Sequence, residues 1–178
     1  QMKNSEDDIL LILSADHFIQ DTKAFYQSLN VALMHAEKGK IVTFGVVPTH
    51  ANTGYGYIQA EKTSDGCDID AMKVKCFKEK PDKKLAEVYL LENDKSRDNN
   101  QTVSWYWNSG MFVCRAKTLI DESSIYSSEI LRKVSISIKN ANYDHDFIRL
   151  EKKTFASSPN LSIDYALMEK SKNVIVVP

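Results

Sequence analysis

The sequence contains little that would place the protein in a membrane or on a nucleic acid. Continuous apolar runs such as residues 9–13 and 174–177 have the length of a strand, whereas a membrane-spanning helix needs roughly 18 apolar residues. Lysine and arginine number 23 against 24 aspartate and glutamate residues, which gives a formal net charge of −1. The chain lacks the basic excess typical of proteins that bind nucleic acid or anionic lipid, so we expect neither as a partner.

Cysteine is also scarce. Cys67, Cys76 and Cys114 are odd in number and scattered, and no two of them form a CxxC pair. A disulfide framework or a zinc knuckle is therefore excluded as the basis of the fold. The first eight residues are polar and acidic, unlike the apolar core of a signal peptide. These features predict a cytoplasmic protein.

The length of 178 residues fits one domain, and we expect a single domain over residues 1–178. Apolar side chains at spacings of three and four predict a helix over residues 24–38, with Gly39 as its stop. Shorter helices are expected over 82–91 and 162–170, and a polar loop over 97–102. Strand patterns occupy residues 9–13, 41–47, 73–77, 110–115 and 173–177. This alternation predicts an α/β domain with a mixed, mainly parallel sheet flanked by helices.

Residues that directly follow a strand are the first candidates for a site, because ligands of α/β sheets bind beyond the carboxyl ends of the strands. Asp16 and His17 follow the first predicted strand. A carboxylate there could bind a metal ion or a sugar hydroxyl, and it could equally cap a turn or a helix. Asp164 is open to the same two interpretations, because a helix N-terminus favours a carboxylate without any ligand.

The segment TGYGYI at residues 53–58 contains two of the six glycines and alternates them with tyrosines. Glycine lets a backbone N–H approach a ligand without a Cβ in the way, and tyrosine adds a flat face with a polar tip. A glycine-kinked strand that packs its tyrosines is the more ordinary alternative. The chain contains neither the dinucleotide fingerprint GxGxxG nor a P-loop, and it also lacks GxSxG and HExxH.

Glu79 and Lys80 end the third predicted strand and precede Pro81, which cannot continue the hydrogen-bonded ladder. The alternation of a strand predicts that their side chains point to opposite faces. A lysine at this position could neutralise a phosphate as a point charge. A solvated pair of charges is the ordinary alternative.

The stretch WYWNSG at residues 105–110 is the least ordinary in the chain. Core packing explains its tryptophans, which lie two residues apart and so share one face of an extended segment. It explains Asn108, Ser109 and Gly110 less well, because amide and hydroxyl side chains are suited to binding sugar hydroxyls. Residues 144–146, DHD, resemble a metal site, but neighbouring side chains point in different directions and we expect a surface turn.

Taken together, these motifs resemble those of the sugar-1-phosphate nucleotidyltransferases, and most closely the bacterial mannose-1-phosphate guanylyltransferases. The blocks that carry the resemblance are ADH at 15–17, TFG at 43–45, TGYGYI at 53–58, EKPD at 79–82, WNSGMF at 107–112 and SIDYALMEK at 162–170. The resemblance covers nearly the whole chain. It implies a Rossmann-like domain that transfers a nucleotide from GTP to mannose 1-phosphate, with Mg²⁺, giving GDP-mannose and pyrophosphate.

The same resemblance implies roles for individual residues. Asp16 and Asp164 are expected to bind Mg²⁺, and together with Lys80, which would hold the sugar phosphate, to be the catalytic residues. Glu79 is expected to hold sugar hydroxyls, and Asn108 to face the sugar. The other residues expected in the substrate site are Gly54, Tyr55, Gly56, Tyr57, Ser109 and Gly110. GTP and mannose 1-phosphate are the expected partners, and the choice between monomer and homodimer stays open.

The chain departs from the family at both ends. The family's GxGTR loop, which wraps the nucleotide phosphates, is absent from the sequence, and the chain stops at Pro178 before a WSDxGSW-like segment. We therefore expect a partial nucleotidyltransferase domain, incomplete at both ends, that binds triphosphate weakly and makes little or no GDP-mannose alone. Ser14 replaces a usual proline, and residues 51–52 replace Pro-Glu; both changes are mild.

Two alternatives remain at this stage. The enzyme could use another nucleoside triphosphate and sugar 1-phosphate, or the chain could be a non-catalytic relative that binds nucleotide sugars. The presence of Asp16, Lys80 and Asp164 together argues against the second alternative, because a protein that only binds does not require both metal carboxylates.

Overall fold

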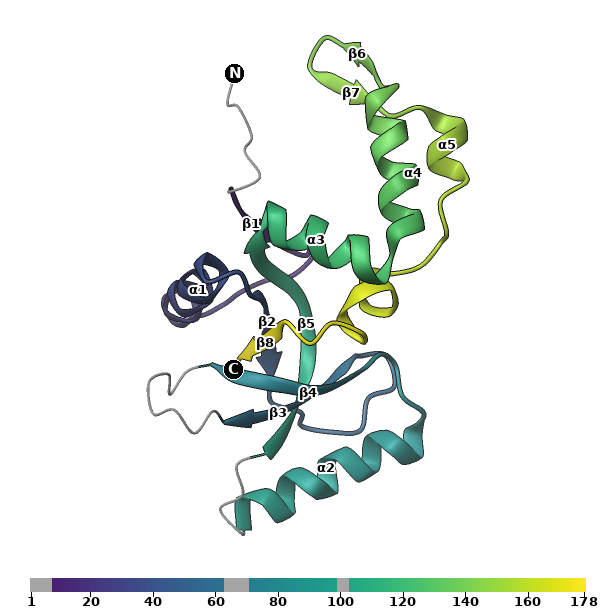
Figure 1. The fold of residues 1–178 in the computed structure, drawn as a ribbon. Coiled ribbons are helices and arrows are strands. Elements are labelled where there is room, and N and C mark those ends of the chain that lie inside the picture. Colours follow the sequence, from purple (N-terminus) through teal and green to yellow (C-terminus); the bar gives the residue numbers. More distant parts are fainter. Residues whose placement is uncertain (1–7, 63–70, 99–102) are drawn as a thin grey trace. The chain divides into compact units, whose positions relative to one another are not determined.

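The structure is a computed structural model that describes residues 8–62, 71–98 and 103–178 (Figure 1). The chain divides into two compact units, and their membership of one domain stays a prediction. The first unit reaches as far as Leu119 and includes Lys172–Pro178, and the second is Ile120–Ser171. Every predicted site residue except Asp164 lies in the first unit.

A six-stranded sheet forms the body of the first unit. In spatial order its strands are β1 (Ile9–Ile12), β5 (Val103–Arg115), β2 (Ile41–Val46), β8 (Val174–Val177), β4 (Met72–Lys78) and β3 (Tyr57–Lys62). The N-terminal part of β5 also pairs with β3, so β5, β2, β8, β4 and β3 close into a small barrel. The C-terminal part of β5 pairs with β1, which lies outside the barrel.

The sheet is mixed, as predicted, but the prediction that it is mainly parallel is wrong. Among the described strands of this sheet, β2 and β8 are parallel and the other pairs are antiparallel. A continuous apolar run indicates that a strand is buried, but it does not indicate whether the neighbouring strand is parallel or antiparallel to it. In β1 even the burial is incomplete, because Leu11 is 41% exposed.

The predicted first helix is confirmed as α1 (Thr22–Glu37). Asp21 caps it, with Oδ1 accepting the N–H of Ala24 at 2.9 Å, and Gly39 follows with a φ of 79°. β1 and β2 run in the same direction, because both are antiparallel to β5, which lies between them. The buried core that this helix shares with the sheet consists of Ala32, Ala36, Val42, Phe44, Ala71, Met111, Val113 and Val177.

The second helix, α2 (Lys83–Asp98), begins after Pro81 as predicted but extends beyond residue 91. Oδ1 of Asp82 accepts the N–H of Leu85 at 2.9 Å at its start. The helix packs on β5 through an aromatic stack, in which the rings of Tyr89 and Trp105 lie 3.6 Å apart with an interplanar angle of 18°. The polar loop predicted over 97–102 lies largely outside the described residues, and its first two residues end α2.

The second unit is mostly helical. Its elements are α4 (Ser128–Lys139), the hairpin β6 (Asn142–Asp144) and β7 (Phe147–Arg149), α5 (Lys152–Ala156) and the π-helical turn η1 (Asp164–Met168); α3 (Ala116–Tyr126) crosses the boundary between the units. Ser137 and Glu151 join α4 to α5, with the Ser137 hydroxyl donating to the Glu151 carbonyl at 2.9 Å. Residues 144–146 form the exposed end of the hairpin, which confirms the predicted surface turn. Within the described residues, no helix is both long and apolar enough to span a membrane.

Candidate active site

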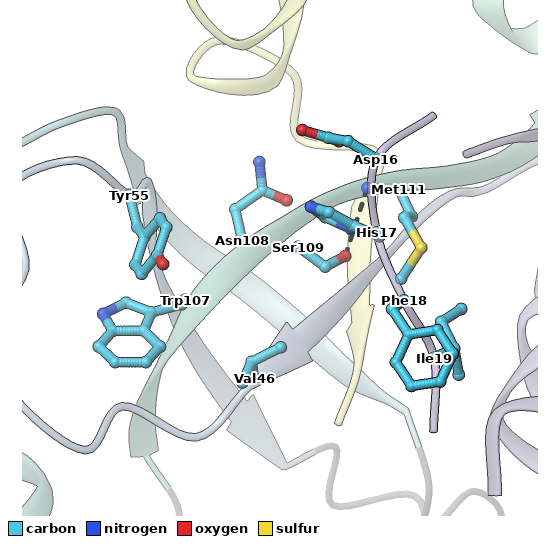
Figure 2. A pocket seen from close by; sticks show the side chains of 10 residues that line it. All are labelled: Asp16, His17, Phe18, Ile19, Val46, Tyr55, Trp107, Asn108, Ser109 and Met111. Atoms are coloured by element: carbon cyan, nitrogen blue, oxygen red, sulfur yellow. Dashed lines mark hydrogen bonds between the residues drawn. The ribbon is translucent and has the colours of Figure 1, made fainter. Parts of the chain in front are cut away.

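A pocket of about 450 Å³ opens on the first unit (Figure 2). Its walls come from the segment after β1, the end of β2, the loop before β3, and the middle of β5. The residues that line it are Asp16, His17, Phe18, Ile19, Val46, Tyr55, Trp107, Asn108, Ser109 and Met111. Four predicted site residues, which come from three separate segments of the chain, therefore meet in one pocket: Asp16, Tyr55, Asn108 and Ser109.

The pocket has a polar end and an apolar end. Figure 2 shows the side chains of Asp16 and Asn108 toward one end, and those of Phe18 and Val46 toward the other. Asp16 follows β1 in an exposed segment, so its carboxylate can be reached from solvent. An exposed carboxylate at the polar end is suited to a divalent cation or to sugar hydroxyls.

Two further predicted residues, Gly56 and Glu79, lie beside this pocket and next to Asn108. The backbone N–H of Asn108 donates to the carbonyl of Gly56 at 2.8 Å. A Cβ built on Gly56 would lie 2.5 Å from Oε2 of Glu79 and 3.3 Å from the Cβ of Asn108. Gly56 thus contacts both Glu79 and Asn108, and glycine is what lets the backbone approach the carboxylate this closely. Glu79 itself is 8% exposed, which is unusual for an acidic side chain.

Lys80 is the cation nearest to this buried carboxylate among the described ion pairs. Its Nζ lies 3.5 Å from Oε1 of Glu79, although 59% of the lysine side chain is exposed. The prediction that the two side chains point to opposite faces is wrong. β4 ends at Lys78, and Lys80 has a φ of 46°, a left-handed conformation that is rare outside glycine. Such a conformation is a local strain of the kind found at binding sites.

Asn108 is placed by an irregularity in β5. Thr43 pairs with Phe112 and Gly45 pairs with Asn108, so residues 109–111 of β5 lie opposite the single residue Phe44 of β2. Gly110 accommodates this bulge with a φ of 73°. Oδ1 of Asn108 accepts hydrogen bonds from the Thr43 hydroxyl at 2.8 Å and from the Gly110 N–H at 3.2 Å.

The remaining residues of the predicted substrate site lie outside the pocket wall. Tyr57 is fully buried, and its hydroxyl accepts the N–H of Asn52 at 3.0 Å. Gly54 donates its N–H to Oδ1 of the same Asn52 at 2.8 Å, so both residues organise the loop that carries Tyr55. Direct contact of Gly54 and Tyr57 with substrate stays a prediction.

Asp164 lies in the second unit, as the first residue of η1. The predicted helix over 162–170 is shorter than expected and π-helical, and the N–H of Tyr165 donates to the Ser162 hydroxyl at 3.5 Å. Within the described residues, no group of three or more histidine, cysteine, aspartate or glutamate side chains is arranged to hold a metal ion. The pairing of Asp16 and Asp164 as Mg²⁺ ligands stays a prediction.

Trp107 lines the pocket but is not among the residues that the sequence predicts for the site. It is 9% exposed, and its indole N–H is buried without a hydrogen-bond partner in the described part of the chain. His50 and Tyr55 contact the ring edge-on, with centroid distances of 5.1 and 5.0 Å. Its position directly before Asn108 is the sequence signal that could have placed it in the site.

The model of the nucleotidyl transferase family matches residues 1–153. The chain belongs to the nucleotidyl transferase family. Mannose-1-phosphate guanylyltransferases from Escherichia coli and Salmonella muenchen are 40% and 44% identical to it over 173 residues, which is 97% of this chain. The same alignments cover 35% and 34% of those proteins, so this nucleotidyl transferase chain spans about a third of their length.

Two solved structures resemble this nucleotidyl transferase in fold. Mannose-6-phosphate isomerase from Helicobacter pylori superposes with a TM-score of 0.81 and 30% identity, over 98% of this chain and 62% of that one. Mannose-1-phosphate geranyltransferase from Thermus thermophilus gives a TM-score of 0.74 and 27% identity, over 95% of this chain and 44% of that one. The predicted family membership is confirmed.

Proposed function

We propose that this chain is part of an enzyme that transfers the guanylyl group of GTP to mannose 1-phosphate, which gives GDP-mannose and pyrophosphate. The observation that carries the proposal is the cluster of Gly56, Glu79, Lys80 and Asn108 beside the pocket. Its buried carboxylate and mostly exposed ammonium lie 3.5 Å apart, so one small molecule that carries hydroxyls and a phosphate can contact both. The similarity of this chain to proteins named mannose-1-phosphate guanylyltransferase supports the choice of mannose 1-phosphate and GTP as the substrates in this proposal.

The chemistry requires two polyanions to approach each other. An oxygen of the sugar phosphate attacks the α-phosphorus of GTP, a new P–O bond forms, and the bond to the β-phosphate breaks so that pyrophosphate leaves. At about 4 Å, two unit charges repel by about 4 kcal/mol at an effective dielectric constant of 20. Lys80 would offset this repulsion by neutralising charge on the attacking phosphate. The protein supplies orientation and charge, and the reaction needs no covalent protein intermediate.

The sugar would lie against Glu79 and Asn108. The Glu79 carboxylate, which lies close to the Lys80 ammonium, can accept hydrogen bonds from sugar hydroxyls. The backbone of Gly56 forms one side of the proposed sugar site. It can lie this close to the Glu79 carboxylate because glycine has no Cβ. In this proposal Tyr55 and Ser109 complete the wall on the pocket side.

Asp16 fits a role in Mg²⁺ binding. Mg²⁺ is usually held by one or two carboxylates, with water and substrate phosphates as the other ligands, and the exposed Asp16 carboxylate at the polar end of the pocket can supply one. When bound, the ion would neutralise charge on the triphosphate. We propose Asp164 as a second carboxylate for the same ion, on the basis of the sequence resemblance.

The test is the release of pyrophosphate by the longest natural chain that contains this sequence. GTP, ATP, UTP and dTTP are each combined with mannose 1-phosphate or glucose 1-phosphate in the presence of Mg²⁺. Turnover confined to GTP and mannose 1-phosphate supports the proposal, and turnover with another pair identifies a different nucleotidyltransferase. Binding of sugar phosphate without any turnover would contradict it and favour a non-catalytic relative. The 178-residue chain alone is expected to show little or no synthesis, because its sequence lacks the GxGTR loop.

A further inference from the structure

A buried threonine lies directly behind Asn108. Thr43 is fully buried on β2, and its hydroxyl is 2.8 Å from Oδ1 of Asn108 and 3.2 Å from the carbonyl oxygen of Met111. Thr43 does not line the pocket, whereas Asn108 does. Any effect of this hydroxyl on a ligand must therefore pass through Asn108 or the bulge around it.

The hydrogen bonds at Asn108 define which way its amide faces. The N–H of Gly110 can only donate, so the amide atom 3.2 Å from it must be the oxygen. The Thr43 hydroxyl approaches the same oxygen and donates its proton there, with the Met111 carbonyl as the competing acceptor. Two donors thus hold Oδ1, and the amide nitrogen, which is itself a donor, faces the other way (Figure 2).

The geometry points to a positioning role for Thr43. We propose that its hydroxyl, together with the Gly110 N–H, fixes the Asn108 amide so that the NH₂ group is turned toward the bound sugar phosphate. The site then recognises an oxygen acceptor on the ligand, either a sugar hydroxyl or a phosphate oxygen. This inference rests on the proposed function, because it assigns a donor to the same sugar-phosphate site.

The β-bulge explains why a residue of β2 can do this. Residues 109–111 lie opposite the single residue Phe44, so the Asn108 side chain is displaced relative to a regular ladder. Continued from the Thr43–Phe112 pair without the bulge, the ladder would place Asn108 across from Val47, whereas the bulge brings it across from Gly45, which has no side chain to offer. Thr43, two residues earlier on β2, reaches the displaced amide instead.

The test compares the affinity for mannose 1-phosphate of Thr43→Val, Thr43→Ser, Asn108→Ala and the double variant Thr43→Val/Asn108→Ala, by NMR titration of the 178-residue chain. Valine has the shape of threonine without the hydroxyl, so Thr43→Val is expected to weaken binding about fivefold. Thr43→Ser keeps the hydroxyl and is expected to stay within about twofold of wild type. In the Asn108→Ala background, Thr43→Val is expected to add no further loss, because the group it positions is gone.

Thr118→Val is the matched control, since Thr118 is another largely buried threonine but lines no part of the pocket. Its affinity for mannose 1-phosphate is expected to equal that of wild type. If Thr43→Val does not fold, Thr43→Ser and Thr43→Ala provide the same comparison, because they differ by one hydroxyl.

The outcomes separate this inference from the function on which it rests. Wild-type chain that does not bind mannose 1-phosphate would overturn the proposed sugar site and the role of Thr43 with it. Wild-type binding that is unchanged in Thr43→Val would overturn the positioning role alone. Losses that simply add in the double variant would show that the Thr43 hydroxyl acts by a route other than Asn108.

Discussion

The backbone of Gly56 packs directly against the carboxylate of Glu79, with room for a hydrogen but not for a methyl group. A Cβ at this position would lie 2.5 Å from Oε2 of Glu79, a distance that real Cβ contacts do not reach. Glu79 is buried and paired with Lys80, so its carboxylate cannot move aside without disturbing that pair. The shape of the proposed sugar site therefore depends on a glycine at residue 56.

We predict that Gly56→Ala weakens binding of mannose 1-phosphate by about tenfold or more, because the new methyl group displaces Glu79. Gly54→Ala is the comparison, since its Cβ would meet only Oδ1 at the end of the Asn52 side chain, at 3.2 Å. NMR titration of the two variants measures the difference. Equal affinities in Gly56→Ala and wild type would show that Glu79 does not hold the sugar.

The side chain of Asn93 on α2 forms hydrogen bonds with the backbone of β5, as a neighbouring strand would. Its Nδ2 donates to the carbonyl of Trp105 at 2.9 Å, and its Oδ1 accepts the N–H of Trp105 at 2.6 Å. Asn93→Ala would leave two buried backbone groups unpaired, and we predict a loss of about 3 kcal/mol in the free energy of unfolding. Urea titration measures this loss. Asp94 is the exposed neighbour of Asn93, and Asp94→Ala should change the free energy of unfolding by less than about 0.5 kcal/mol. A loss as small as this in Asn93→Ala would contradict the hydrogen bonds between Asn93 and Trp105.

Tyr89 gives the stability a dependence on alkaline pH. Burial raises its pKa from 10.0 to about 12, with smaller contributions from the negative charges of Cys76, Glu92 and Asp82. The unfolded chain loses this proton near pH 10 while the folded chain keeps it, so the stabilisation is complete below pH 10 and is lost as the pH rises toward 12.

We predict that Tyr89→Phe removes this part of the pH dependence. The free energy of unfolding of the variant, relative to wild type, should rise between pH 9 and pH 11 in chemical denaturation. Cys114, whose pKa burial raises to about 11, is present in both proteins and cancels in the difference. A difference that is constant over this range would show that Tyr89 ionises equally in the folded and unfolded chains.

Asp164 is the remaining candidate for metal binding. We predict that Asp164→Asn reduces pyrophosphate release by about a hundredfold or more in the longest natural chain, because an amide replaces a carboxylate ligand of similar size. The far-ultraviolet circular dichroism of the variant should match that of wild type. Asp144→Asn, which removes a surface ion pair with Arg149, is the control and should retain its rate. Normal turnover in Asp164→Asn would remove this residue from the site.

Local features of the fold could be predicted because their causes are local. Helix α1 follows from its apolar spacing, its Asp21 cap and the glycine after it, all within one short segment. The end of β4 before Pro81 is equally local, because proline cannot donate to the ladder. The segments that form the pocket could also be identified, because Asp16, Tyr55 and Asn108 lie in motifs whose combination resembles that of the sugar-1-phosphate nucleotidyltransferases.

Features that depend on distant segments could not be predicted. The barrel closes through the pairing of β3 with the start of β5. An apolar run in the sequence indicates neither the direction of a strand nor the strand with which it pairs. In the second unit, residues 134–138 alternate apolar and polar side chains with the period of a strand, yet they lie in α4. The contact between Glu79 and Lys80 depends on a positive φ at a lysine, which no residue pattern indicates.

Lys80 is the residue that we propose to bind the phosphate of a sugar 1-phosphate, and the most direct test of this role is the affinity of Lys80→Gln for mannose 1-phosphate. Lys75→Gln is the matched control, because Lys75 is an exposed lysine that pairs with Glu61 on the neighbouring strand β3. NMR titration of the 178-residue chain at low salt should show binding weakened about tenfold or more in Lys80→Gln and unchanged in Lys75→Gln. Equal affinities in Lys80→Gln and wild type would contradict the account.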